Sequence, residues 1–205
     1  MNFYGGQAAL IRSDLRARLL GAFFFAAVTA VCSQISLHLW FTPVPVTLQV
    51  LGVILSGLVL GSRWGAVSQI QYIILGTLGM PVFSGFTAGP MALVGPSGGY
   101  IFGFVLGAFV TGLVFEHLKK KTWSALWVAG IAGMVGVYIL GASWLAVWLR
   151  FAGGKQWSDC FFSAWQLGIV PFIGIDILKA LAASSLALGG RYGRGLLQAG
   201  RNLGW

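Results

Sequence analysis

Charged residues are scarce in this sequence, because Asp, Glu, Lys and Arg together make up only 8% of its 205 residues. Soluble domains carry roughly 25% charged residues, so this composition excludes an ordinary fold in water. Acidic residues are the scarcest, with four Asp and Glu against thirteen Lys and Arg. The longest mainly polar stretch is the N-terminal dozen residues, which leaves no room for a separate soluble domain.

Residues that carry chemistry in enzymes are also few. The two cysteines, Cys32 and Cys160, lie within or beside apolar runs, which indicates packing residues and no disulfide or metal framework. Paired catalytic acids, a nucleophile elbow, a His-rich metal cluster and a Gly-rich Walker sequence are all missing. We therefore expect neither an enzyme nor a bound metal or cofactor, and any ATP must be used by other chains.

Apolar residues dominate what is present. They make up 58% of the chain, with nine Trp, fifteen Phe and thirty-one Gly, and the mean hydropathy is +0.86. Aromatics gather at membrane interfaces, and glycines let membrane helices approach closely. The sequence predicts an all-α integral membrane protein forming a single membrane domain, residues 1–205. Its six expected spans are 15–39, 46–62, 64–79, 98–117, 123–149 and 162–188, the first retained rather than cleaved as a signal peptide.

The positive charges form short clusters at the ends of apolar segments, which indicates membrane topology and not a nucleic-acid surface. Six spans put both termini on one side. Ten cations fall on that side: Arg12, Arg16, Arg18, Arg63, Lys119, Lys120, Lys121, Arg191, Arg194 and Arg201. Arg150 and Lys155 fall on the other side, and Lys179 lies within a span. The positive-inside rule then places both termini in the cytoplasm.

Asp176 and Lys179 are the only formally charged residues of the last apolar run. A spacing of three places them on one helical face, within reach of each other. A lone charge near the bilayer centre costs at least roughly 2.5 to 3.5 kcal/mol on insertion scales, so such a pair must face a protein interior. It indicates either a functional site or an internal ion pair that locks two helices together.

The segment 80–97 and its flanks combine six glycines and three prolines with apolar residues and no charge. Such backbone is tolerated at a membrane only where protein or a cavity covers it. We expect a structured loop over a pocket, with aromatic walls from Phe83, Phe86 and Tyr100; the alternative is a tight connector. Ser97 is a candidate N-cap, after which the backbone amides of Ser97 to Tyr100 would be available to an anionic group.

Two further features leave alternatives open. Gln49 follows Pro43 and Pro45 and lies in the first turns of the second helix, where its amide suits either a polar ligand or a hydrogen bond between helices. Ala22, Ala26 and Ala30 recur every fourth residue of the first span. Such a small-residue ridge either receives a partner helix or reflects the ordinary frequency of alanine.

Four motifs resemble the BioY proteins, the biotin-binding S components of energy-coupling factor (ECF) transporters. They are Pro45-Val-Thr-Leu-Gln49 with Gly52 and Gly57, Gly76-Thr-Leu-Gly-Met-Pro-Val-Phe83, Gly95-Pro-Ser-Gly-Gly-Tyr100, and Pro171-Phe-Ile-Gly-Ile-Asp-Ile-Leu-Lys179. They occur in family order and spacing over nearly the whole chain.

The resemblance implies a six-helix S-component fold, a buried biotin site on the extracytoplasmic side, and uptake across the cytoplasmic (inner) membrane of a prokaryote. It implies as partners one ECF membrane coupling protein and two cytoplasmic ATPase subunits, with the ridge of Ala22, Ala26 and Ala30 docking on the coupling protein. The alternatives are an S component for another vitamin and a solitary biotin transporter. The expected ligand-binding residues are Gln49, Phe83, Ser84, Phe86, Gly99, Tyr100, Asp176 and Lys179.

Biotin fits these side chains chemically. Its urea has N–H donors for the Asp176 carboxylate, and its thioether ring suits aromatic walls. Lys179 either donates to the urea carbonyl or neutralises Asp176. The valerate carboxylate suits backbone amides at a helix start or a cation from a loop.

Overall fold

The computed structural model describes residues 3–119, 122–154 and 156–202, and the side chains of 3–13, 153 and 191–202 are outside the description. Lys120, Lys121 and Lys155 of the predicted topology therefore lie outside the described residues. The main helices in order are α1 Phe3–Gln34, α2 Gln49–Leu60, α3 Ser62–Thr77, α5 Gly98–His117, α6 Trp123–Gly153, α7 Trp157–Gly168 and α8 Val170–Asn202. Shorter elements are the strands β1 Ser36–Leu37 and β2 Val46–Thr47, the 3-10 helix η1 Ser84–Phe86, and α4 Met91–Val94.

Within the described residues, four helical segments are long and apolar enough to cross a membrane: Asp14–Gln34, Gly98–His117, Trp123–Ala152 and Val170–Gly190. Helices α2 and α3 occupy the second and third predicted spans but contain only 12 and 16 residues. At 1.5 Å per residue they are about 18 and 24 Å long, against a hydrocarbon core about 30 Å thick. Six complete spans therefore stay a prediction.

The first predicted span, 15–39, is too long at its C-terminal end. Helix α1 ends at Gln34, and the chain then forms an antiparallel hairpin in which Ser36 pairs with Thr47 and Leu37 with Val46. The N–H of Leu48 donates to the carbonyls of Cys32 and Ile35, both at 3.2 Å, and so satisfies the end of α1. Because Val46 and Thr47 belong to the hairpin, the second helix begins at Gln49 and not at residue 46.

The last predicted span, 162–188, is not one continuous helix, since it is divided at Ile169 into α7 and α8. Pro171 has no N–H to give to the carbonyl of Leu167, four residues earlier. That carbonyl instead accepts the hydroxyl of Thr42 at 2.7 Å, and the carbonyl of Gly168 accepts the Tyr100 hydroxyl at 2.7 Å. Both carbonyls freed by the break are thereby satisfied, and the loop after β1 is tied to α7.

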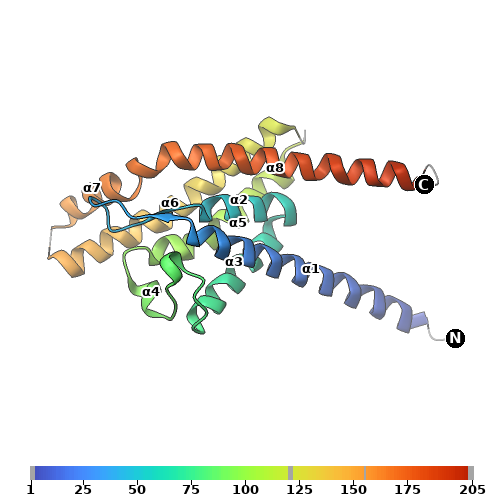
Figure 1. Cartoon of the computed structure of the whole chain (residues 1–205), viewed down its shortest axis with the longest axis horizontal. Coiled ribbons are helices and arrows are strands. Elements are labelled where there is room, and N and C mark those ends of the chain that lie inside the picture. Colours follow the sequence, from blue (N-terminus) through green and yellow to red (C-terminus); the bar gives the residue numbers. More distant parts are fainter. Residues whose placement is uncertain (1–2, 120–121, 155, 203–205) are drawn as a thin grey trace.

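Helix α5 packs most extensively against α6 and also contacts α2 and α3. Small residues allow this close approach, since a Cβ on Gly103 would lie 2.8 Å from the Val137 carbonyl of α6. Helix α1 begins and α8 ends at the same end of the molecule, while the hairpin loop and α7 lie toward the opposite end (Figure 1). The side of the membrane that each end faces stays a prediction.

Candidate functional site

A cavity of about 280 Å³ lies among the hairpin, α2, the 80–97 segment, α5, α6 and α8. Its lining combines apolar and aromatic side chains with a few polar groups, which is typical of small-molecule sites. The segments between α1 and α2 and between α3 and α5 both contribute to its wall. Residues of the 80–97 segment thus line a cavity, and the role of this segment as a cover over a ligand stays a prediction.

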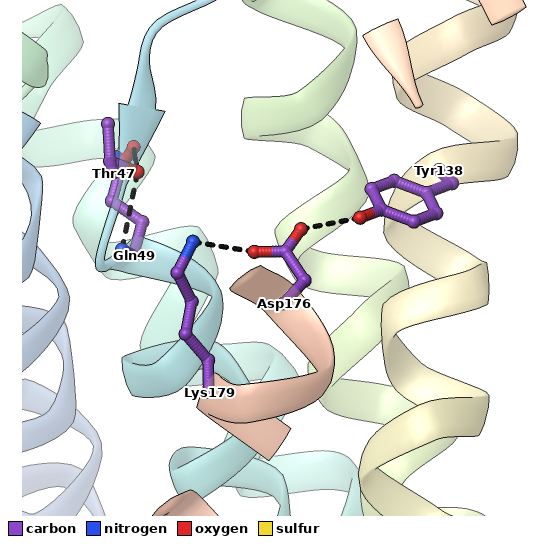
Figure 2. Close-up of polar contacts among 5 residues, drawn as sticks. All are labelled: Thr47, Gln49, Tyr138, Asp176 and Lys179. Carbon is purple, nitrogen blue, oxygen red and sulfur yellow. Dashed lines mark hydrogen bonds and ion pairs between the residues drawn. The ribbon is translucent and has the colours of Figure 1, made fainter. Parts of the chain in front are cut away.

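The buried end of the cavity carries an ion pair, Asp176 and Lys179, together with the hydroxyl of Tyr138 (Figure 2). The Lys179 ammonium lies 2.5 Å from Oδ1 of Asp176, and the Tyr138 hydroxyl of α6 donates to Oδ2 at 2.6 Å. The exposed fractions are 2% for Asp176, 4% for Lys179 and 8% for Tyr138. Each carboxylate oxygen has about two lone pairs, so both retain acceptor capacity toward a ligand.

A second polar chain starts at the hairpin. The Thr47 hydroxyl donates to Oε1 of Gln49 at 2.7 Å, and Nε2 of Gln49 donates to the Tyr72 hydroxyl at 2.6 Å. Thr47 and Gln49 line the same cavity as Asp176 and Lys179. The hydrogen bond from Gln49 to a neighbouring helix is therefore present, and because the residue also borders the cavity, its contact with a ligand stays a prediction.

Residues 81–86 are held by the last turn of α1. The Ser33 hydroxyl donates to the Val82 carbonyl at 2.6 Å, and Nε2 of Gln34 donates to the Phe83 carbonyl at 3.2 Å. The N–H of Phe86 donates back to Oε1 of Gln34 at 2.9 Å. The Phe83 ring is 1% exposed and meets Tyr72 edge to face, with ring centroids 5.5 Å apart. The segment is thus an ordered part of the cavity wall.

The cavity wall includes most of the residues expected to bind ligand: Gln49, Phe83, Ser84, Tyr100, Asp176 and Lys179. The Ser84 hydroxyl is buried and makes no hydrogen bond within the described residues, so it is available to a ligand. Two expected residues, Phe86 and Gly99, are not part of this wall. Phe86 is 69% exposed, and a Cβ on Gly99 would lie 2.7 Å from the Leu140 carbonyl of α6.

Ser97 occupies the N-cap position of α5 but makes no capping hydrogen bond through its side chain. The N–H of Gly98 donates to the Gly95 carbonyl and that of Tyr100 to the Ser97 carbonyl, both at 3.0 Å. Two of the amides expected to receive an anion are therefore already engaged.

Sequence reasoning missed Tyr138 and His38, both of which line the cavity. Tyr138 is 38 residues from Asp176 in the chain, so no helical spacing connects them. The available signal was a hydroxyl within an apolar span, which must face protein or a cavity. His38 follows β1 and comes to the cavity only because the chain after α1 forms the hairpin.

The ridge of Ala22, Ala26 and Ala30 faces the interior of the chain. Ala22 and Ala26 are 0% exposed, Ala30 packs against the core, and α1 contacts α2 and α3. Close packing against small residues therefore occurs within the molecule, and the structure does not present this ridge as a free surface. Contact between the ridge and a second protein stays a prediction.

We expect Ala26→Trp to lower thermal stability together with ligand binding and uptake, because a large side chain cannot enter this packed position. Overpacking a core costs typically about 1 to 3 kcal/mol. Leu20, also on α1 but 70% exposed, provides the control Leu20→Trp. Thermal unfolding and equilibrium binding of the two purified variants check this. Loss of uptake with full stability and binding in Ala26→Trp would instead favour a partner interface.

Comparison with known proteins identifies the family of this chain. The model of the BioY family matches residues 9–193. The biotin transporter BioY of Thermotoga maritima is 40% identical over 171 residues, which cover 83% of this chain and 94% of that protein. The probable biotin transporter BioY of Pyrococcus horikoshii is 42% identical over 163 residues, covering 80% and 89% of the two chains.

A solved structure has the same fold. It is the crystal structure of the S-component for biotin from an ECF-type ABC transporter, with a TM-score of 0.75 and 25% sequence identity. The similarity covers 88% of this chain and 93% of that one. Together, the family match, the sequence relatives and the fold show that the chain belongs to the BioY family.

Proposed function

We propose that this chain binds biotin with high affinity and serves as the substrate-binding subunit for its uptake across the cytoplasmic membrane. The observation that carries the proposal is the cavity in which the Asp176, Lys179 and Tyr138 group borders aromatic walls. The relatives that are named biotin transporters, and the solved biotin S-component of similar fold, support the same ligand.

Binding of the urea group follows from the hydrogen-bonding capacity of the buried end. The remaining lone pairs of Asp176 accept a urea N–H, and the Lys179 ammonium has donors beyond the one given to Asp176. The Ser84 hydroxyl supplies a further donor and acceptor. The thioether ring packs between aromatic side chains such as Phe83 and Tyr100, because sulfur contacts aromatic rings favourably.

For transport we propose the ECF arrangement, in which a membrane coupling protein and two cytoplasmic ATPase subunits act with this chain. The solved structure of similar fold is a component of such a transporter, which supports this assignment. Both termini then lie in the cytoplasm, and the cavity opens on the extracytoplasmic side. Solitary biotin transport and binding of another vitamin are the alternatives that the binding and uptake measurements test.

The purified chain is expected to bind biotin one to one, tightly and without ATP, because all the residues that line the cavity belong to this chain. Titration calorimetry in detergent measures the stoichiometry, with thiamine and riboflavin as control ligands. Heat from either control ligand, with none from biotin, would reassign the substrate. Uptake of radiolabelled biotin by cells that lack the ATPase subunits separates solitary from ECF-dependent transport.

A further inference from the structure

The exposure of the lining residues distinguishes a mouth from a floor in the cavity. Asp176, Lys179 and Gln49 are at most 6% exposed, which places them at the floor. His38, Pro43 and Thr87 line the same cavity but belong to the exposed class, which places them at the mouth. The polar groups at the two ends therefore meet different parts of an elongated ligand.

The floor is suited to a neutral polar group and not to an anion. The ammonium group at the floor, that of Lys179, is already neutralised by the Asp176 carboxylate at 2.5 Å. A ligand carboxylate placed there would be desolvated beside the like charge of Asp176, which is unfavourable. A ligand with a neutral polar head and a carboxylate tail therefore binds with its tail at the mouth.

One basic side chain at the mouth of the cavity can bind such a carboxylate. Two basic residues line the cavity within the described chain, Lys179 at the floor and His38 at the mouth. The His38 imidazole makes no hydrogen bond to another described residue, and an imidazole ring offers at least one N–H donor in either charge state. The competing donors at the start of α5 are partly engaged, since Gly98 and Tyr100 donate to backbone carbonyls.

We propose that His38 binds the carboxylate of the ligand at the mouth and so selects biotin over uncharged analogues. This rests on the proposed function, because it takes biotin as the ligand and its urea as the group at the floor. His38 is carried by the β1–β2 hairpin, whose loop is anchored to α7 through the Thr42 hydroxyl and the Leu167 carbonyl at 2.7 Å. The donor is thus presented from an anchored loop.

The test compares biotin with biotin methyl ester, which retains the urea and both rings but has no ionised carboxylate. Wild type is expected to bind biotin about tenfold more tightly, equivalent to about 1.4 kcal/mol. In His38→Phe, biotin affinity is expected to fall about tenfold and ester affinity to stay within about twofold, which removes the preference. His38→Gln, which keeps a donor, is expected to retain part of it. The matched control is His117→Phe, which changes an exposed histidine outside the cavity lining.

Each outcome has a separate meaning. An unchanged preference for biotin in His38→Phe, or an equal loss of both ligands, would overturn the role of His38. Equal binding of biotin and its ester by wild type would also overturn that role while leaving the proposed function intact. Binding of neither compound by wild type would refute the proposed function itself. Melting temperatures of the variants identify any loss that is due to folding.

Discussion

Replacement of Asp176 by Asn is expected to weaken biotin binding by one to two orders of magnitude. The change keeps the size of the side chain but replaces an acceptor-only carboxylate with an amide. Hydrogen bonds to charged groups contribute roughly 1.5 to 3 kcal/mol, and each 1.4 kcal/mol is tenfold in affinity. Asp159→Asn is the matched control, since this carboxylate is exposed on α7 and does not line the cavity.

A double variant separates a ligand site from an internal lock. Asp176→Asn leaves the Lys179 ammonium, 4% exposed, without its carboxylate. Breaking a buried pair by removing one partner is strongly destabilising, whereas replacing both partners by uncharged groups is often neutral. Adding Lys179→Met should therefore restore the melting temperature but not biotin affinity. Recovery of both would show that the pair is structural, leaving Gln49 and Ser84 as the polar contacts.

The second large effect is expected from Gly76→Ala. Gly76 is near the end of α3, and a Cβ there would overlap the Phe83 ring. The Gly76 carbonyl also accepts the N–H of Gly89 at 2.8 Å, so α3 is bonded to the 80–97 segment after η1. Overpacking costs typically about 1 to 3 kcal/mol. Because displacement of Phe83 alters the cavity wall, biotin affinity should fall by about tenfold or more, together with thermal stability.

The control is the same substitution at Gly174 of α8, where a Cβ would meet no heavy atom within 4 Å. Alanine there should leave binding unchanged and favour the helix by roughly 0.5 to 1 kcal/mol. Adding Phe83→Leu to Gly76→Ala should relieve the overlap and recover stability, although the aromatic wall remains lost. Calorimetry and thermal unfolding follow both quantities. Identical behaviour of Gly76→Ala and Gly174→Ala would contradict this account of the loop.

The parts of the site that sequence reasoning found are those that a local pattern determines. The spacing of three between Asp176 and Lys179 places them together on any helix, and their burial follows from the cost of charge in a membrane. The apolar, glycine- and proline-rich composition predicted an ordered cover around Phe83. In each case the necessary information lies within about one turn or one loop.

The parts that were missed depend on partners far apart in the sequence. Tyr138 reaches Asp176 only because α6 packs beside α8. The Leu167 carbonyl, left without a helical partner by Pro171, accepts the hydroxyl of Thr42 from 125 residues away. Composition likewise shows that the 80–97 segment contains aromatic residues but not which way their side chains point. In the structure Phe83 is buried and Phe86 is exposed.

The ion pair of Asp176 and Lys179 also has an electrical consequence for a protein in an energised membrane. Moving one elementary charge across a potential of 100 mV changes its free energy by about 2.3 kcal/mol. The two charges are opposite and 2.5 Å apart, so together they form a dipole with no net charge. The transmembrane voltage therefore exerts no net force on this pair, whereas an anionic ligand adds one unit of charge on which the voltage acts.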